Sequence, residues 1–352
     1  MAYSINGIQQ IGIGVQDAEA NWTWYRKAFG MDVPIFRDKA AATLMSPFTG
    51  GEVHERFAIL AMNLQGGGGF EVWQYTSRIP QSAAFDIQLT DLGILAIKIR
   101  CRDINQAKVH LEDIGATILN QPNKSPAGDC HFYVKDPFGN LFEIIENSSW
   151  FSDNKGVTGG VCGVLIGCSS IEKSLPLYRD LLGHDEVKSD CIDLFDDIKS
   201  LAGGDVKYRR VVMTKAGKPT GAFGRLLCQS EIELISTEKT TGRRIFKDRF
   251  WGDLGFIHLC FDVNGMDDLK AKALSLGFDF KVDSKDNFDM GKAAGRFAYI
   301  EDLDGTLVEL VETFKVPIFA PLGIYLNLKS RKKTGPLPNL MIKALGLNRV
   351  KE

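Results

Sequence analysis

The sequence predicts an α+β protein built from four β-α-β-β-β modules, and two kinds of internal repeat support this fold class. Residues 8–32 (IQQIGIGVQDAEANWTWYRKAFGMD) match residues 161–185 (VCGVLIGCSSIEKSLPLYRDLLGHD), and residues 94–118 are related to residues 256–280. Each of these segments reads as a short strand, a polar turn and a helix. In addition, DPFGNLFEIIE and DLDGTLVELVE repeat an Asp–Gly turn and a strand that carries a glutamate among apolar residues. Repetition of this kind predicts duplicated structural units.

The elements follow the same order in every module. In the first and third modules the helix is expected to end at Gly30 or Gly183, because glycine is the residue that most often follows a helix. Further strand-like stretches then lead to a closing strand with an acid: Glu71, Glu143, Glu233 and Glu309. The run QGGGG at 65–69 precedes a strand and not a helix, so it reads as a hairpin turn and not as a phosphate loop.

The repeats also predict where the chain divides. We expect a first domain over 5–148 (modules 5–80 and 92–148), a linker over 149–160 and a second domain over 161–315 (modules 161–238 and 254–315). Residues 316–352 fall outside the repeat and form a C-terminal extension, expected to pack on the body of the same chain. The 352 residues are enough for two ordinary domains.

Composition narrows the class of function. A net charge of −2 argues against non-specific binding to nucleic acid or to an anionic membrane. The first residues, MAYSINGIQQ, lack the features of a signal peptide, and no uncharged stretch approaches membrane-spanning length. The seven cysteines form no CxxC pairs, which fits a reduced, cytoplasmic protein. We expect a monomer or homodimer whose partner is a small molecule.

Four modules that each open with a strand and helix and close on an acidic strand resemble the vicinal oxygen chelate superfamily. That superfamily includes glyoxalase I, methylmalonyl-CoA epimerase, extradiol dioxygenases and bleomycin-resistance proteins, so the resemblance does not by itself fix a function. It covers about residues 5–315. In this family, paired modules form a cupped sheet, and each module offers two ligand positions. Carried over to this chain, the opening positions are Gln10, Ala96, Gly163 and His258, and the closing positions are Glu71, Glu143, Glu233 and Glu309.

The resemblance leaves two ways to pair the modules. If neighbours pair, each cup is incomplete: one holds Gln10, Ala96, Glu71 and Glu143, and the other holds Gly163, His258, Glu233 and Glu309. If the outer modules pair, as in fused glyoxalase-type chains, one cup gathers Gln10, Glu71, His258 and Glu309. The inner modules would then leave Glu143 and Glu233 to be satisfied by a lysine, an arginine or water. We favour the second pairing because it explains which ligands remain.

The ligand types suit a divalent metal. Carboxylate and amide oxygens with one imidazole form a site for Zn²⁺, Ni²⁺, Co²⁺, Fe²⁺ or Mn²⁺. By resemblance to glyoxalase I, the ion would act as a Lewis acid on a vicinal carbonyl or hydroxyl and stabilise an enediolate-like intermediate. A displaced glutamate would move the proton, with Glu309 the first candidate for this base and Glu71 the second.

Three functions follow as alternatives. The first is a metal-dependent lyase or isomerase of glyoxalase type that acts on a small oxygenated substrate. The second is an extradiol-type dioxygenase, which requires two histidines and a carboxylate around Fe²⁺, whereas Gly163 stands where the first histidine should be. The third is a metal-free binding protein of the resistance type, which Ala96 and Gly163 would favour.

Basic residues near the last module are candidates for substrate binding. The segment RRIFKDRFWGD offers Arg243, Arg244 and Arg249, which could bind a carboxylate or phosphate, although a solvated loop is the simpler interpretation. A lid over the cup formed by residues 288–302, which include Gly291 and Gly295, with Arg296 pointing inward is a further possibility. Among the histidines outside the ligand positions, His110 and His184 lie on or just after helices and are expected at the surface.

Overall fold

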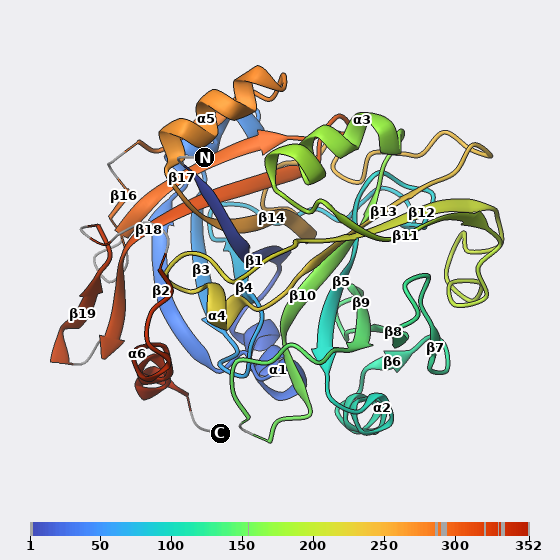
Figure 1. Ribbon diagram of the computed structural model, residues 1–352. Coiled ribbons are helices and arrows are strands. Elements are labelled where there is room, and N and C mark those ends of the chain that lie inside the picture. The colour runs from blue at the N-terminus through green and yellow to red at the C-terminus, as the bar shows by residue number, and fades with distance from the viewer. Residues whose placement is uncertain are drawn as a thin grey trace.

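The computed structural model describes residues 3–153, 155–285, 288–289, 294–319, 322–329, 331 and 335–350. Two mixed β-sheets dominate this part of the chain, and short helices pack against them (Figure 1). The α+β class predicted from the repeats is confirmed. The glycine-rich run lies in the hairpin between two antiparallel strands, as expected. Within the described residues, no helix is long and apolar enough to cross a membrane.

The ten-stranded sheet, called the outer sheet, joins the first and last modules. Its strand order is β15-β17-β18-β14-β1-β4-β3-β2, with β16 beside β17 and β19 beside β18. From the first module come β1 (Ser4–Val15), β2 (Val33–Ala41), β3 (Glu55–Met62) and β4 (Gly69–Tyr75). From the last module and the segment after it come β14 (Gly255–Asn264), β15 (Val282–Asp283), β16 (Phe288–Asp289), β17 (Ala294–Glu301), β18 (Leu307–Phe319) and β19 (Ile324–Asn327).

The nine-stranded sheet, called the inner sheet, joins the second and third modules. Its order is β11-β12-β13-β10-β5-β9-β8-β6, with β7 beside β8. The second module supplies β5 (Gly93–Cys101), β6 (Thr117–Ile118), β7 (Asn123–Lys124), β8 (Cys130–Lys135) and β9 (Leu141–Glu146). The third supplies β10 (Thr158–Gly167), β11 (Glu186–Asp193), β12 (Tyr208–Thr214) and β13 (Glu231–Ser236).

This strand order decides between the two pairings. Each sheet takes one module from each half of the sequence, so neither 5–148 nor 161–315 closes a sheet by itself. The division into two consecutive domains therefore describes the sequence repeat and not the sheets. The reason is that β1 forms its antiparallel ladder with β14, and β5 forms the matching ladder with β10. Figure 1 shows the dark blue β1 beside β14 of the last module.

Consecutive modules are joined through their helices. The helices are α1 (Ala18–Phe29), α2 (Ile104–Asp113), α3 (Ile171–Leu175, continued as a π-helix over Pro176–Leu181), α4 (Gly224–Leu227), α5 (Met266–Ser275) and α6 (Asn339–Lys343). The Tyr25 hydroxyl donates to Asp136 at 2.8 Å, and the Tyr178 hydroxyl donates to Asp302 at 2.9 Å. The repeated Tyr-Arg helix of one module thus binds the repeated Asp–Gly turn of the next. One hydrophobic core runs behind both sheets, including Phe70 and Phe142.

The C-terminal extension packs on the outer sheet, as expected. Leu337, Ile342 and Leu345 are buried in an apolar cluster with Met62 and Val316. Backbone hydrogen bonds at both ends of this segment, from Leu337 to Ala222 and from Val350 to Asp32, fix its position.

Candidate metal centre

Four strands of the outer sheet bring the candidate ligands together. Gly12 of β1 stands opposite His258 of β14 on one side and opposite Glu71 of β4 on the other. The parallel pairing of β14 with β18 places Cys260 opposite Glu309, and Gln10 also stands opposite Cys260. The four ligands predicted from the outer modules therefore lie on four neighbouring strands, β18, β14, β1 and β4, at nearby positions along those strands.

The side chains of these residues converge on one point. His258 Nε2 lies 3.2 Å from Glu309 Oε2 and 3.4 Å from Glu71 Oε2. Gln10 Nε2 donates to Glu309 Oε2 at 3.3 Å. One ligand atom each of Glu71, His258 and Glu309 lies within 4.8 Å of the others. Bonds of about 2.0–2.2 Å to one ion would place two ligand atoms at most about 4.4 Å apart, so a small adjustment suffices.

Residues that sequence reasoning missed hold the imidazole of His258 in place. Tyr299 of β17 places its hydroxyl 3.4 Å from His258 Nδ1. The indole of Trp251 lies nearly parallel to the imidazole, with ring centroids 6.1 Å apart. When Nδ1–H donates to Tyr299, the Nε2 lone pair faces the two carboxylates, which is the form that a metal ligand needs.

Gly12 provides the space for this ring. A Cβ atom at position 12 would lie 2.3 Å from His258 Cε1, closer than any van der Waals contact. A glycine inside an apolar strand (IGIGV) often marks a close approach by another group, so the sequence did carry this signal.

The carboxylates of the site lack a balancing cation from the protein. Among the described residues, no lysine or arginine pairs with Glu71 or Glu309, and His258 is their only ion-pair partner. Burial raises the pKa of Glu309, and repulsion from Glu71 adds to this, while His258 opposes it. Burial by itself would lower the pKa of His258, but Glu309 and Glu71 outweigh burial and raise it. One buried and one partly buried carboxylate with one imidazole form an electron-rich site that favours a cation.

Two buried polar atoms at the site are unsatisfied. Neither Gln10 Oε1 nor His258 Nε2 has a hydrogen-bond partner of acceptable geometry. Native proteins rarely leave such atoms unpaired. Both belong to the donor types that bind a divalent cation, so the residues present fit a metal ion.

A cavity of about 110 Å³ opens beside the cluster. Gln10, Glu71 and Glu309 form its polar end, and most of the remaining lining is apolar. The acids are therefore accessible from the cavity, whereas His258 is completely buried behind them.

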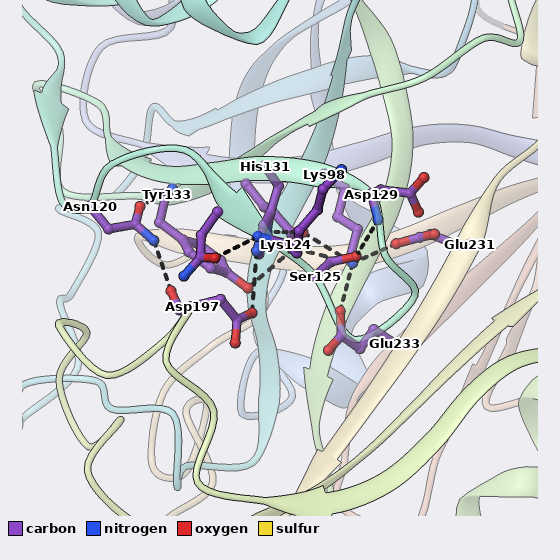
Figure 2. A network of polar contacts seen from close by, with 12 residues as sticks. Lys98, Asn120, Lys124, Ser125, Asp129, His131, Tyr133, Asp197, Glu231 and Glu233 are labelled. Atoms are coloured by element: carbon purple, nitrogen blue, oxygen red, sulfur yellow. Dashed lines mark hydrogen bonds and ion pairs between the residues drawn. The ribbon is translucent and has the colours of Figure 1, made fainter.

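The equivalent position in the inner sheet is filled by a lysine. The register makes Ala96 the counterpart of His258 and Gly163 the counterpart of Gln10. Figure 2 shows Lys98 beside Glu231 and Glu233, and its ammonium lies 2.5 Å and 2.6 Å from these carboxylates. It also lies 3.2 Å from Glu143. A Cβ atom at Gly163 would lie 3.1 Å from Lys98 Cδ, so the glycine makes room for this side chain.

Further charges complete the inner cluster. Arg210 pairs with Glu233 at 2.6 Å and with Asp197 at 2.7 Å. His131 contacts Glu143 at 2.7 Å and Asp197 at 3.3 Å. Burial would lower the pKa of His131, but these two carboxylates raise it to about 9, so the imidazole is charged. The expectation that a lysine or arginine satisfies Glu143 and Glu233 is confirmed.

The arginines proposed to bind substrate do not border this cavity. Arg243 pairs with Asp91 at 2.8 Å, and Arg244 and Arg249 donate to backbone carbonyls of neighbouring loops. Arg244 and Arg249 border a separate depression beside β5. Phe297 of β17 lines the cavity. Its neighbour Arg296 points to the opposite face of this strand and pairs with Asp283 at 2.9 Å. Of the expected lid, Gly291 lies outside the described residues, whereas Gly295 belongs to β17 and pairs with β18 in the outer sheet.

His184 differs from its expected surface position. It is completely buried, with Nε2 3.4 Å from the Ser230 hydroxyl and its ring against Phe261. Burial, with a smaller contribution from Lys215, lowers its pKa to about 3. The chain turns inward after the helix at Gly183, which has a φ of 73°, and this carries the next residue under the sheet.

Comparison with known proteins agrees with this architecture. Residues 7–144 match the family model of the Glyoxalase/Bleomycin resistance protein/Dioxygenase superfamily. The match covers the first two modules, and all four modules have the arrangement of this fold. The family match confirms, for residues 7–144, the resemblance to the vicinal oxygen chelate superfamily that the repeats predict.

Particular solved structures share the fold over most of the chain. Glyoxalase I from Zea mays is 16% identical, with 88% of this chain and 92% of that chain covered and a TM-score of 0.53. A protein from Bacillus subtilis subsp. subtilis str. 168, named only provisionally as a dioxygenase, is 13% identical, with 88% and 86% covered and a TM-score of 0.58. At these identities the likeness shows the fold alone. The comparison with curated protein sequences found no match.

Proposed function

We propose that the protein is a divalent-metal-dependent enzyme of glyoxalase type, a lyase or isomerase, whose metal ligands are Gln10, Glu71, His258 and Glu309. The convergence of these four side chains, with no described lysine or arginine to balance the two carboxylates, carries the proposal. The likeness in fold to glyoxalase I over 88% of the chain supports the same class of chemistry.

The residues around the proposed metal would each have a separate role in the reaction. A bound Zn²⁺, Ni²⁺, Co²⁺, Fe²⁺ or Mn²⁺ would supply Lewis-acid chemistry to two neighbouring oxygens of a substrate. Glu309 borders the cavity and is oriented by Gln10, so it is the first candidate to accept a proton from the carbon beside those oxygens. Glu71 borders the same cavity and is the second candidate. Trp251 and Tyr299 pack around His258 and keep water from that side.

Two features weigh against the rival functions. The described metal centre holds a single histidine, whereas an extradiol-type dioxygenase needs two. Ala96 and Gly163, which would favour a metal-free binder, both belong to the inner sheet, where Lys98 replaces the ion. The outer cup keeps all four ligand types.

Metal analysis tests the proposal directly. Purified protein is incubated with each of the five ions, freed of excess ion and analysed by mass spectrometry, together with His258→Ala and Glu309→Ala. We expect about one ion per chain in the wild type and a loss in both variants. His110→Ala serves as the control because His110 is half-buried on α2, outside the cup. A wild-type protein that binds none of the ions would refute the proposal.

A further inference from the structure

The cavity beside the metal centre has an unusual distribution of charge. Glu71 and Glu309 are the only charged side chains among the described residues that line it. Gln9, Gln10 and Thr313 are the other polar ones, and no lysine or arginine of the described residues contributes. Beyond the proposed metal position, an anionic group on a substrate would meet no positively charged side chain of this lining. The cavity therefore suits an uncharged molecule.

Apolar side chains form the rest of the cavity wall. Ile35 and Met62 come from the edge of the outer sheet, Phe223 from the segment before α4, and Val316 from the far part of β18. Val316 lies seven residues beyond Glu309 on this strand, so the lining follows up to roughly 20 Å of strand. A cavity of this kind gains binding energy from the burial of a hydrocarbon group.

The C-terminal extension closes this apolar region. Leu345 is 2% exposed and contributes to the lining, although it belongs to the segment outside the repeat. Asn348 donates to the carbonyl of Ile318 at 3.1 Å, and Arg349 pairs with Asp32, so the segment is tied to the sheet on both sides. Leu347, two residues further, is 62% exposed and faces away from the cavity.

We propose that the substrate of the outer cup is an uncharged molecule with an aliphatic or aromatic group beside its pair of oxygens, and that Leu345 limits the length of this group. The inference about the oxygen pair depends on the proposed metal centre, whereas the inference about the apolar group depends only on the residues of the cavity wall. The two parts can therefore be tested separately.

The first arm of the test uses metal-loaded protein. Straight-chain hydroxamic acids from two to twelve carbons carry two neighbouring oxygens and a hydrocarbon tail, and calorimetry gives their affinities. We expect the affinity to increase about fourfold with each added methylene group, up to a limiting length of the tail. Suberic acid monohydroxamate, which ends in a carboxylate, should bind at least tenfold more weakly than octanohydroxamic acid. Equal affinity of these two, or affinity independent of length, would overturn the proposal.

The second arm tests Leu345 by a shift in the limiting length. Leu345→Ala removes three carbon atoms from the end of the cavity and should lengthen the preferred tail by about two to three carbons. Leu347→Ala is the matched control and should leave the preferred length unchanged. Leu345→Val, a milder change, covers the case in which the alanine variant does not fold, and it should move the length in the same direction. An unchanged preferred length in every folded Leu345 variant would refute the role of this residue.

The third arm separates this inference from the proposed function. Metal-free protein is titrated with 1-alkanols of the same lengths, which need no metal. Length-dependent binding that shifts in the Leu345 variants supports the apolar site even if the protein binds no metal. If metal binds but neither alkanols nor hydroxamic acids show length dependence, the proposed function stands and this inference fails.

Discussion

Gly12 shows how much the proposed metal centre depends on a residue that has no functional group. Its missing side chain leaves the space in which the His258 ring lies. We expect Gly12→Ala to displace the imidazole and to lower metal affinity about 10- to 100-fold, the usual effect of disturbing the support of a ligand. Competition titration against a fluorescent chelator measures this change. Gly335→Ala is the control because a Cβ atom there would contact nothing, and equal affinity of both variants would contradict the expectation.

The burial of His184 should make the stability of the folded protein depend on pH. Its pKa is about 3 in the folded protein but near 6.5 in an unfolded chain, so the unfolded state binds the proton first as the pH falls. The free energy of unfolding should therefore decrease below pH 6.5, by about 2 kcal/mol from this residue alone at pH 5. Urea denaturation at pH 7.5 and pH 5 measures the decrease. In His184→Gln the decrease should be smaller by that amount, and an identical decrease in the variant would count against the interpretation.

At the scale of elements, β5 and β14 show two solutions to the same electrostatic problem. Each strand carries a side chain that faces two glutamates of nearby strands. On β5 this side chain is Lys98, which faces Glu143 and Glu233, and on β14 it is His258, which faces Glu71 and Glu309. The inner sheet therefore carries its own cation. Its stability should be indifferent to chelators, while that of the outer sheet should increase when an ion binds.

Removal of the internal cation should be costly. Lys98→Met leaves Glu143, Glu231 and Glu233 with less compensation in a buried site, so we expect the free energy of unfolding to fall by about 3–5 kcal/mol. Lys135→Met changes an exposed lysine of the same sheet. This variant should alter the free energy of unfolding by no more than about 0.5 kcal/mol. Chemical denaturation followed by circular dichroism compares the two variants. A loss of similar size in both would show that the cluster contributes little.

Local patterns in the sequence predicted the elements and the acids well. The Asp–Gly turns and the glutamates among apolar residues are properties of a few neighbouring positions, so Glu309 and Glu143 could be placed on closing strands. Lys98 was not identified from the sequence, although it lies two positions after Ala96 and so on the same face of the strand. The arginines at 243–249 were harder to interpret. Their partners, such as Asp91, lie some 150 residues away in the sequence.

At the scale of the whole molecule, the interleaved sheets predict that half of the chain cannot fold alone. A fragment of residues 1–157 would leave β1 without β14 and β5 without β10, each an unpaired strand with an apolar face. We expect this fragment to aggregate or to remain unfolded, whereas the full chain should unfold in a cooperative transition. Size-exclusion chromatography and thermal unfolding of both proteins provide the measurement. A monomeric fragment with a cooperative transition would contradict the expectation.

The same interleaving sets an order of assembly during synthesis. Leu165 pairs with Ala96, 69 residues earlier, whereas Asn264 pairs with Ser4, 260 residues earlier. At about 5–20 residues per second, β1 would wait roughly 13–50 seconds on the ribosome for its partner strand. The inner sheet, with Lys98 already in place, can form during that interval without any ion from the cell. The proposed metal centre would then be the last part of the protein to be completed.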